Sequence, residues 1–410
     1  MRKISEELLV LLALFLPWHG AITVFFPDNW RFWKELLLVV FFFLVLLLEL
    51  RRRYKEKDSF SLLWTDVLAF LFLVWLGALV VVDGDKNTAL MAARYIGTGF
   101  IVFLLTSRFL SHLDQARKVV LFSRISVALL SSSICAVFFG IWMKYFGGIE
   151  VLQNFYSPTI SSWVPGQTVP LYHMAGGFIR MQGGSSGPTE FASILLAGLL
   201  ILPFLPLIRK WKRVIAFLLL IGIFQSFSRM ALLLALGVIL FYFCSQYRKH
   251  LKKVVLSLGI VVLMGLGVLF GNKTVYQNFF ERAGSSEHIT RPIQAIRAGL
   301  YRPFTGNLGE LGPSARIKNL REYNDDTAMI AENVFADYFA QMGMLGLGLA
   351  ILFFVFLFRE TSSQAWPFLV AVLVSANTAT LFDMTPVSIL FFLLFAFFVS
   401  LRKIRLETTF

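Results

Sequence analysis

Long uncharged stretches recur through this chain and restrict what it can fold into. Seven of them reach the roughly 17–25 residues that a helix needs to cross a bilayer. They are Leu8–Phe26, Ile125–Met143, Phe191–Ile208, Val254–Asn272, Tyr338–Phe358, Thr361–Phe382 and Met384–Leu401. Hydrophobic residues make up 57% of the 410 positions, and 44 are Phe, which exceeds what a soluble core of this size needs. The sequence therefore predicts a polytopic membrane protein.

Five further apolar runs are shorter or less clean, and we count them as additional candidate spans. They are Leu36–Leu48, Val67–Val82, Tyr95–Ser107, Val214–Ser228 and Met230–Tyr247. We find no repeat at a solenoid period and no linker that would separate domains. The expected fold is thus all-α, with about twelve transmembrane helices in a single transmembrane domain over residues 1–410.

Basic residues cluster at alternate ends of these spans, which predicts the orientation of the chain. The clusters are Arg2–Lys3, Arg51–Lys57, Arg108–Arg124, Arg209–Arg213, Lys249–Lys253 with Arg248, and Arg402–Arg405. With Arg359 they hold 23 of the 38 basic residues and fall on one side if twelve spans alternate. Both termini are therefore expected in the cytoplasm. The net charge of +14 is mostly a topogenic signal, and nucleic-acid binding is a poor explanation of it.

Two long loops are expected on the opposite, outer side, at residues 144–188 and 273–337. The second loop carries eight basic residues although the topogenic bias disfavours them there: Lys273, Arg282, Arg291, Arg297, Arg302, Arg316, Lys318 and Arg321. A solvated loop helix would explain any single one of them. The cluster as a whole favours an anion site for phosphate, and we place the candidate active site in this loop.

Two further arginines are expected near the outer membrane boundary. Arg229 lies between two spans. Its side chain either extends to the membrane–water interface or binds an anion, which would offset the desolvation cost of about 2.5–3.5 kcal/mol. Arg180 and Glu190 flank a glycine-rich stretch that ends at Pro188. Glycines there allow close backbone approach to a ligand, although they also suit a simple turn before a helix.

Glu332 is the candidate general base. We expect it to open the helix of the tenth span, followed by Asn333 and close to the arginine cluster. A carboxylate at a helix N-terminus is favoured by the helix dipole alone, but an ionised Glu at the water–lipid boundary can also accept a proton. His288, three residues before Arg291, is a reserve candidate. No His or carboxylate pair has metal-ligand spacing, so neither a metal nor another cofactor is predicted.

In these motifs the chain resembles the O-antigen ligase and O-antigen polymerase superfamily of bacterial envelope enzymes. Four local matches carry the likeness: Ser228-Arg229 at the head of a span, Arg180 through Pro188-Thr189-Glu190, Arg291 through Arg302-Pro303 to Gly306 and Gly309, and Glu332-Asn333 through Gly343 to Gly346. Each motif is short and degenerate. Their common order and their placement on the outer side make the set moderately specific.

The resemblance implies glycosyl transfer, without metal, from an undecaprenyl-diphosphate-linked glycan to a hydroxyl of a glycan or lipid A-core acceptor at the outer face of the bacterial inner membrane. Arg229 and Arg291 would hold the diphosphate, and Glu332 would take the place of a family His. Substrate-binding roles are expected for Arg180, Glu190, Arg297, Arg302, His288 and Asn333. The chain departs from the family at two positions, with Glu332 in place of His and Glu190 in place of Asn. The first of these tilts the prediction from ligase towards polymerase.

Two other functions stay open on the sequence alone. A glycosyltransferase that uses a prenyl-monophosphate sugar would need a metal-assisted acid in the short outer loop between the first two spans, where Asp28 is the candidate. A lipid-linked oligosaccharide flippase or other transporter would typically show paired repeats and charges near the bilayer midplane. The unexplained charges lie at one face, so we rank transport third.

Overall fold

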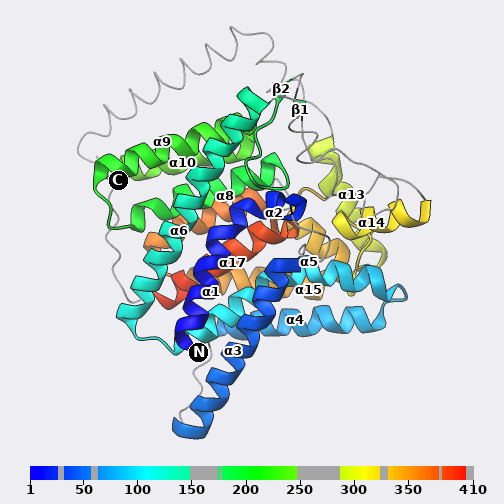
Figure 1. Ribbon diagram of the computed structural model, residues 1–410. Coiled ribbons are helices and arrows are strands. Elements are labelled where there is room, and N and C mark those ends of the chain that lie inside the picture. Colours follow the sequence, from blue (N-terminus) through cyan, green and yellow to red (C-terminus); the bar gives the residue numbers. More distant parts are fainter. Residues whose placement is uncertain are drawn as a thin grey trace.

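The chain, described here as a computed structural model, is built almost entirely from helices (Figure 1). The structure describes residues 1–25, 32–56, 63–147, 174–175, 178–246, 287–323, 331–377 and 381–402. In the first part of the chain the elements are α1 (Arg2–Phe15), η1 (Leu16–Trp18), α2 (His19–Phe25), α3 (Trp33–Glu56), α4 (Trp64–Val82), α5 (Lys86–Ser111), α6 (Gln115–Trp142) and η3 (Met143–Gly147). A short antiparallel hairpin of β1 (Met174–Ala175) and β2 (Phe178–Ile179) follows.

The second part of the chain continues with further helices. They are α8 (Pro188–Ile201), η5 (Leu202–Phe204), α9 (Arg209–Gln225), α10 (Arg229–Gln246), α13 (Glu287–Tyr301), α14 (Gly312–Tyr323), α15 (Val334–Glu360), η8 (Ser363–Ala365), α16 (Trp366–Ala376), η9 (Leu381–Asp383) and α17 (Thr385–Ser400). The prediction of a helical chain is confirmed.

Five helical segments of the described chain are long and apolar enough to cross a membrane: Arg2–Thr23, Trp64–Val82, Lys86–Ser111, Gln115–Gly147 and Val334–Glu360. Shorter apolar helices cover Pro188–Phe204, Arg229–Ile239, Ser363–Ala376 and Thr385–Ser400. The count of twelve spans and the cytoplasmic placement of the termini stay predictions. The expected span Val254–Asn272 lies outside the described residues.

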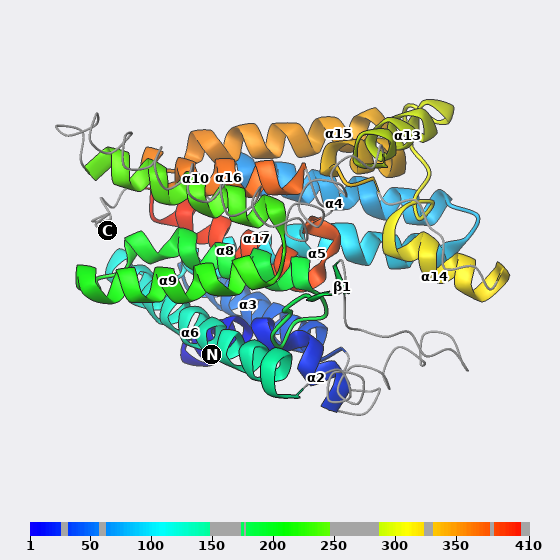
Figure 2. The same ribbon diagram turned by 90° about the horizontal axis from the view of Figure 1, so that it is seen from above.

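The helix α17 lies at the centre of the bundle (Figures 1 and 2) and is buried on all sides. A helix that is apolar all round suits such a position. Its Phe392 ring lies 4.8 Å from the ring of Phe100 in α5 and 5.8 Å from that of Phe353 in α15. Gly99 of α5 allows this approach, because a Cβ there would lie only 2.5 Å from Ser388 Oγ.

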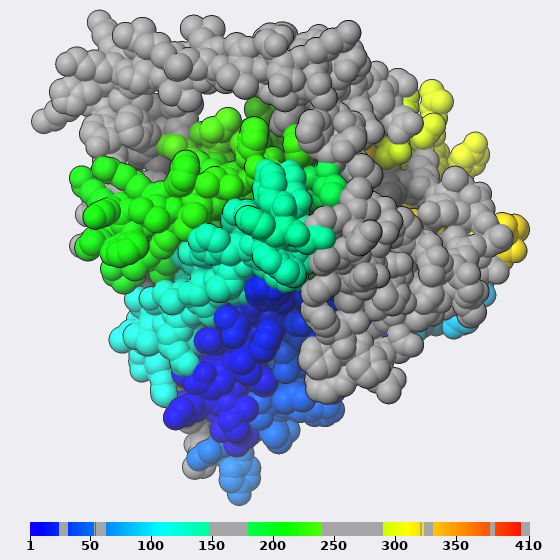
Figure 3. Space-filling view, turned by 45° about the horizontal axis from the view of Figure 1, so that its top comes forward, coloured from blue at the N-terminus to red at the C-terminus, as the bar shows by residue number. Residues whose placement is uncertain are grey.

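The remaining helices pack around this centre, both with sequence neighbours and with helices far away in the sequence. The helix α4 packs against both α5 and α15, and α8 packs against α9 and α17. The helix α6 lies between α1 and α9, and the space-filling view shows the same blue, cyan and green order (Figure 3). The fold therefore brings segments from both halves of the chain into one body.

Contacts near the helix termini show which helices share each end of the bundle. Lys318 of α14 lies 3.6 Å from Asp85, just before α5, and α2, α13 and α14 lie at this same end (Figure 2). At the opposite end, Glu360 at the end of α15 accepts a hydrogen bond from the start of α4. We call these the outer end and the inner end, after the orientation that the basic residues predict.

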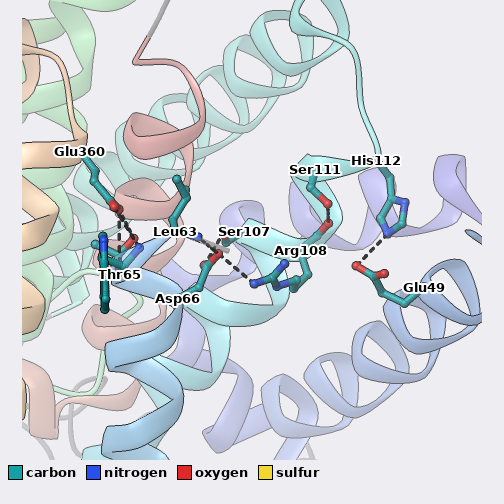
Figure 4. A network of polar contacts seen from close by, with 10 residues as sticks. Glu49, Leu63, Thr65, Asp66, Ser107, Arg108, Ser111, His112 and Glu360 are labelled. Carbon is teal, nitrogen blue, oxygen red and sulfur yellow. Dashed lines mark hydrogen bonds and ion pairs between the residues drawn. The ribbon is translucent and has the colours of Figure 1, made fainter. Parts of the chain in front are cut away.

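A polar network holds α4 in place at the inner end (Figure 4). Glu360 accepts a 2.6 Å hydrogen bond from the Thr65 hydroxyl, and both side chains are buried. Asp66 accepts from Ser107 Oγ at 2.7 Å and from Arg108 Nη2 at 3.0 Å. Because each buried carboxylate has donors from a second helix, the network ties α4 to both α15 and α5.

The substitution Thr65→Val tests this network. It keeps the side-chain shape but removes a buried donor to a charged acceptor, so we expect a loss of about 1.5–3 kcal/mol in the free energy of unfolding. Thermal unfolding of the purified protein in detergent would measure it. Ser133→Ala is the control, because Ser133 is buried and its hydroxyl has no hydrogen-bond partner within the described chain. An equal effect of both substitutions would contradict the assignment.

Candidate functional site

The turn before α15 is held by a helix cap. Asn333 Oδ1 accepts hydrogen bonds from the N–H groups of Phe335 at 3.1 Å and Ala336 at 2.9 Å, which satisfies two donors that a helix start leaves open. Glu332 precedes the cap with a φ of +53°, a conformation that costs a side-chain-bearing residue about 1–2 kcal/mol. The expectation that Glu332 opens the helix is wrong, because α15 begins at Val334.

The structure brings Glu332 and Arg291 together. The carboxylate Oε1 of Glu332 is paired with Arg291 Nη1 of α13. The Glu332 side chain is 16% exposed and that of Arg291 is 34% exposed, so both can be reached from outside the bundle. Such a pair in a strained turn combines a carboxylate and a cation within one site. Strained conformations of this kind cluster at functional sites.

Close packing of α13 on α15 positions Arg291. Gly299 lies against the first turns of α15, where a Cβ would be 2.6 Å from the Phe339 ring and 3.1 Å from Ala340 Cα. Pro292 near the start of α13 follows Arg291 directly. Because Gly299 carries no side chain, the helix carrying Arg291 approaches the helix that follows Glu332.

The loop after α13 docks onto a break in α15. Gly343 has a φ of +67° inside α15 and interrupts the helix there. Met344 N–H donates to Pro303 O at 2.7 Å, and Asn307 N–H donates to Ala340 O at 2.9 Å. Gly306 also has a positive φ, of +65°, and lies against the same break. Two motifs that are separate in the sequence therefore interlock.

A buried polar chain extends this contact. The Gln341 amide donates to both oxygens of Asp337 at 2.9 Å, and its carbonyl accepts from Gly309 N–H at 3.1 Å. Asp337 is 1% exposed and Gln341 2% exposed. The glycine-containing loop is thus fixed to α15 about two turns after the helix begins.

Arg180 belongs to a second group, at the turn between α9 and α10. Its Nε donates to Ser226 O at 2.9 Å, and the neighbouring Met181 N–H donates to Gln225 O at 2.9 Å. Lys144 reaches the same turn, with Nζ 2.6 Å from Gln225 Oε1. Arg229 is the first residue of α10 and half-buried. Two cations, Arg180 and Lys144, therefore contact the turn at residues 225–228, and a third, Arg229, directly follows it.

Glu190 lies in the first turn of α8 and is buried, with 7% of its surface exposed. Its Oε1 accepts from Ser186 N–H at 3.2 Å and so closes the glycine-rich turn on itself. Gly184 O accepts from Ala21 N–H at 2.8 Å, and a Cβ at Gly184 would lie 2.7 Å from the Trp18 ring. This loop is packed against the α1–α2 segment.

The other predicted site residues lie further out or outside the described part. Arg297 and Arg302 are exposed, and Arg302 Nη1 lies 3.4 Å from Asn307 Oδ1. His288 belongs to α13, but its side chain is not among those that the structure describes. Lys273 and Arg282 lie outside the described residues. Asp28, the acid of the alternative metal-assisted mechanism, is outside it as well.

The part of the chain that contains α10, α13, α14 and the start of α15 matches a known protein family. Residues 214–351 match the O-antigen ligase family. The match confirms the resemblance to the O-antigen ligase and polymerase superfamily. No curated protein has a significant sequence match to the chain.

The O-antigen ligase match extends from α9 into α15 and includes Arg229, Arg291, Glu332 and Gly343. Arg180 and Glu190 lie before it, although hydrogen bonds tie Arg180 to a turn within it. The match and the apolar helices together indicate a multi-pass membrane protein. The role of each site residue stays a prediction.

Two residues near these groups were missed at the level of the sequence. Lys144 contacts the Arg180 turn, as described above. Asp383, in η9, is 7% exposed, and its Oδ2 has no hydrogen-bond partner among the described residues. Burial, and then the nearby Asp337 carboxyl, raise the pKa of Asp383 well above its usual value. A lone carboxylate between two long uncharged runs is a signal that would have found it.

Within the described residues, no group of three or more His, Cys, Asp or Glu side chains is placed to hold a metal ion.

Proposed function

We propose that the protein transfers a glycan from an undecaprenyl-diphosphate-linked donor to an acceptor hydroxyl at the outer face of the membrane, with the second outer loop as active site. The observation that carries this proposal is the pairing of Arg291 with Glu332 inside the region that matches the O-antigen ligase family. This pairing supplies a cation for the leaving group next to a carboxylate that can accept a proton.

Donor binding would separate the two partners. The diphosphate is a stronger ligand for the Arg291 guanidinium than a single carboxylate, because it offers several charged oxygens. Arg229, with Arg180 at the adjacent turn, would contact the same diphosphate. Glu332 is then free to act on the acceptor.

The transfer step forms one C–O bond, breaks another, and moves one proton. Glu332 accepts the proton of the acceptor hydroxyl while that oxygen attacks the anomeric carbon of the donor glycan. The bond between that carbon and the diphosphate oxygen breaks, and undecaprenyl diphosphate leaves with its charge stabilised by Arg229 and Arg291. Arg297, Arg302, His288, Asn333 and Glu190 are assigned to binding the glycans.

The reaction class favoured is polymerisation, in which the acceptor is another lipid-linked repeat unit. The support is Glu332 at the family's His position, and it is modest because a carboxylate base serves ligation to a lipid A-core acceptor equally well. Product length therefore decides between the two reactions.

An assay with purified protein in detergent tests the proposal. We expect undecaprenyl-diphosphate-linked repeat units, given alone, to be converted into longer lipid-linked glycans at a rate that a chelator does not change. Glycan length would be read by gel and mass spectrometry. No product unless lipid A-core is added would indicate a ligase. Use of a monophosphate donor only, with inhibition by chelator, would favour the mechanism through Asp28 instead.

A further inference from the structure

A polar cavity lies at the inner end of the bundle, away from the candidate active site. It has a volume of about 280 Å³, is partly open to the surface, and is lined by the start of α4, the end of α5, the start of α6 and the end of α17. This is close to the lower limit of about 300–1,000 Å³ for ligand sites in proteins. Figure 4 shows one wall of it, formed by Asp66, Ser107, Arg108 and Ser111.

The lining of this cavity is positively charged. Three cations line it, Arg108, Lys118 and Arg402, against one carboxylate, Asp66. That carboxylate is already engaged by Ser107 and Arg108 within the wall. The net charge of the lining is therefore positive, and hydroxyl groups lie beside it.

Lys118 and Arg402 differ from neighbouring cations of the inner end. Arg117 and Arg124 of α6 are paired with Glu6 and Glu7 of α1. Within the described chain, neither Lys118 nor Arg402 has a carboxylate within 4.0 Å, although Lys118 is half-buried. A partly desolvated cation is stabilised by an anion, and the cavity beside it has room for one.

We propose that this cavity binds the phosphate-bearing head group of an anionic membrane lipid. Basic pockets between transmembrane helices on the inner side of a membrane suit such head groups. Apolar surface for the acyl chains is close by, because Trp64 and Val120 stand one and two residues from lining residues and are 61% and 58% exposed. The proposal is independent of glycan transfer and rests on the helix ends and on the orientation that the basic residues predict.

The test uses the full-length protein in detergent with added phosphatidylglycerol or phosphatidylcholine. Native mass spectrometry would measure bound lipid, and thermal unfolding would measure protection. We expect phosphatidylglycerol to bind and protect the wild type, and the double variant Lys118→Gln/Arg402→Gln to bind it about tenfold or more weakly, since each cation near the surface contributes to anionic lipid binding. If the double variant does not fold, Arg402→Gln alone, at an exposed position, is expected to weaken phosphatidylglycerol binding as well.

The matched control is Lys210→Gln/Arg213→Gln. It removes the same two charges from exposed positions of α9 that are expected on the same membrane side but do not line the cavity. Retained binding in this control, with loss in the cavity variant, supports the proposal. Equal loss in both variants, equal binding of phosphatidylcholine, or equal protection by inorganic phosphate would overturn it.

Discussion

Replacing Glu332 with Gln is expected to lower the rate of glycan transfer by about 10²- to 10⁴-fold while the protein still inserts and folds. The amide has nearly the shape of the carboxylate but accepts no proton at neutral pH. Because the side chain is partly exposed and lies in a turn, the substitution removes no core packing. Turnover of lipid-linked repeat units by purified protein, at saturating donor, is the measurement.

Arg291→Ala separates the two roles in this pair. It leaves the base in place but removes charge stabilisation of the leaving group, so we expect loss of activity together with weaker donor binding; Arg229→Ala should behave alike. The control is Glu310→Gln, which removes an exposed carboxylate from the docked loop. Full activity in Arg229→Ala and Arg291→Ala would refute the proposed site.

Replacing Gly343 with Ala is expected to detach the docked loop from α15. A Cβ at this position would lie 2.3 Å from the Phe304 carbonyl carbon and 2.6 Å from Thr305 N, both of them backbone atoms. The positive φ adds about 1–2 kcal/mol of strain. We therefore expect at least about 2 kcal/mol of destabilisation and loss of transfer, since the Arg291 and Glu332 segments flank this loop.

Gly348→Ala is the matched control in the same helix. A Cβ there would meet nothing within 4 Å, and Ala in a helix interior is about 0.5–1 kcal/mol more stable than Gly. Thermal unfolding in detergent and the transfer assay would be run on both variants. If the two glycine substitutions behave alike, the break at Gly343 has no special role.

The helical, membrane-spanning character of the chain was predictable because it depends on local composition. Runs such as Leu8–Phe26 need only enough apolar residues in succession, and the helices are found there. The central position of α17 was not predictable in the same way. Which apolar helix is surrounded by the others depends on close approaches such as that of Gly99 to Ser388.

The candidate site shows the same division. The closeness of Glu332 to an arginine followed from their common loop, and the structure pairs it with Arg291. The left-handed turn at Glu332 could not be predicted from the sequence, because Glu has no intrinsic preference for this conformation. The turn precedes a helix cap by Asn333, for which the sequence predicted a substrate-binding role instead. The interlocking of Gly306 with Gly343 depends on the Ala340 carbonyl and the Met344 N–H, which bond to the loop at a break that no local pattern indicates.

The burial of α17 also bears on the order of membrane assembly. This helix follows every helix around it in the sequence, so α5 and α8 enter the bilayer before their common neighbour is made. Until residue 385 is synthesised, Phe100 lacks its contact with Phe392, and α5 and α8 lack the helix that lies between them in the finished bundle. The last helix therefore completes the packing of helices that have already been made.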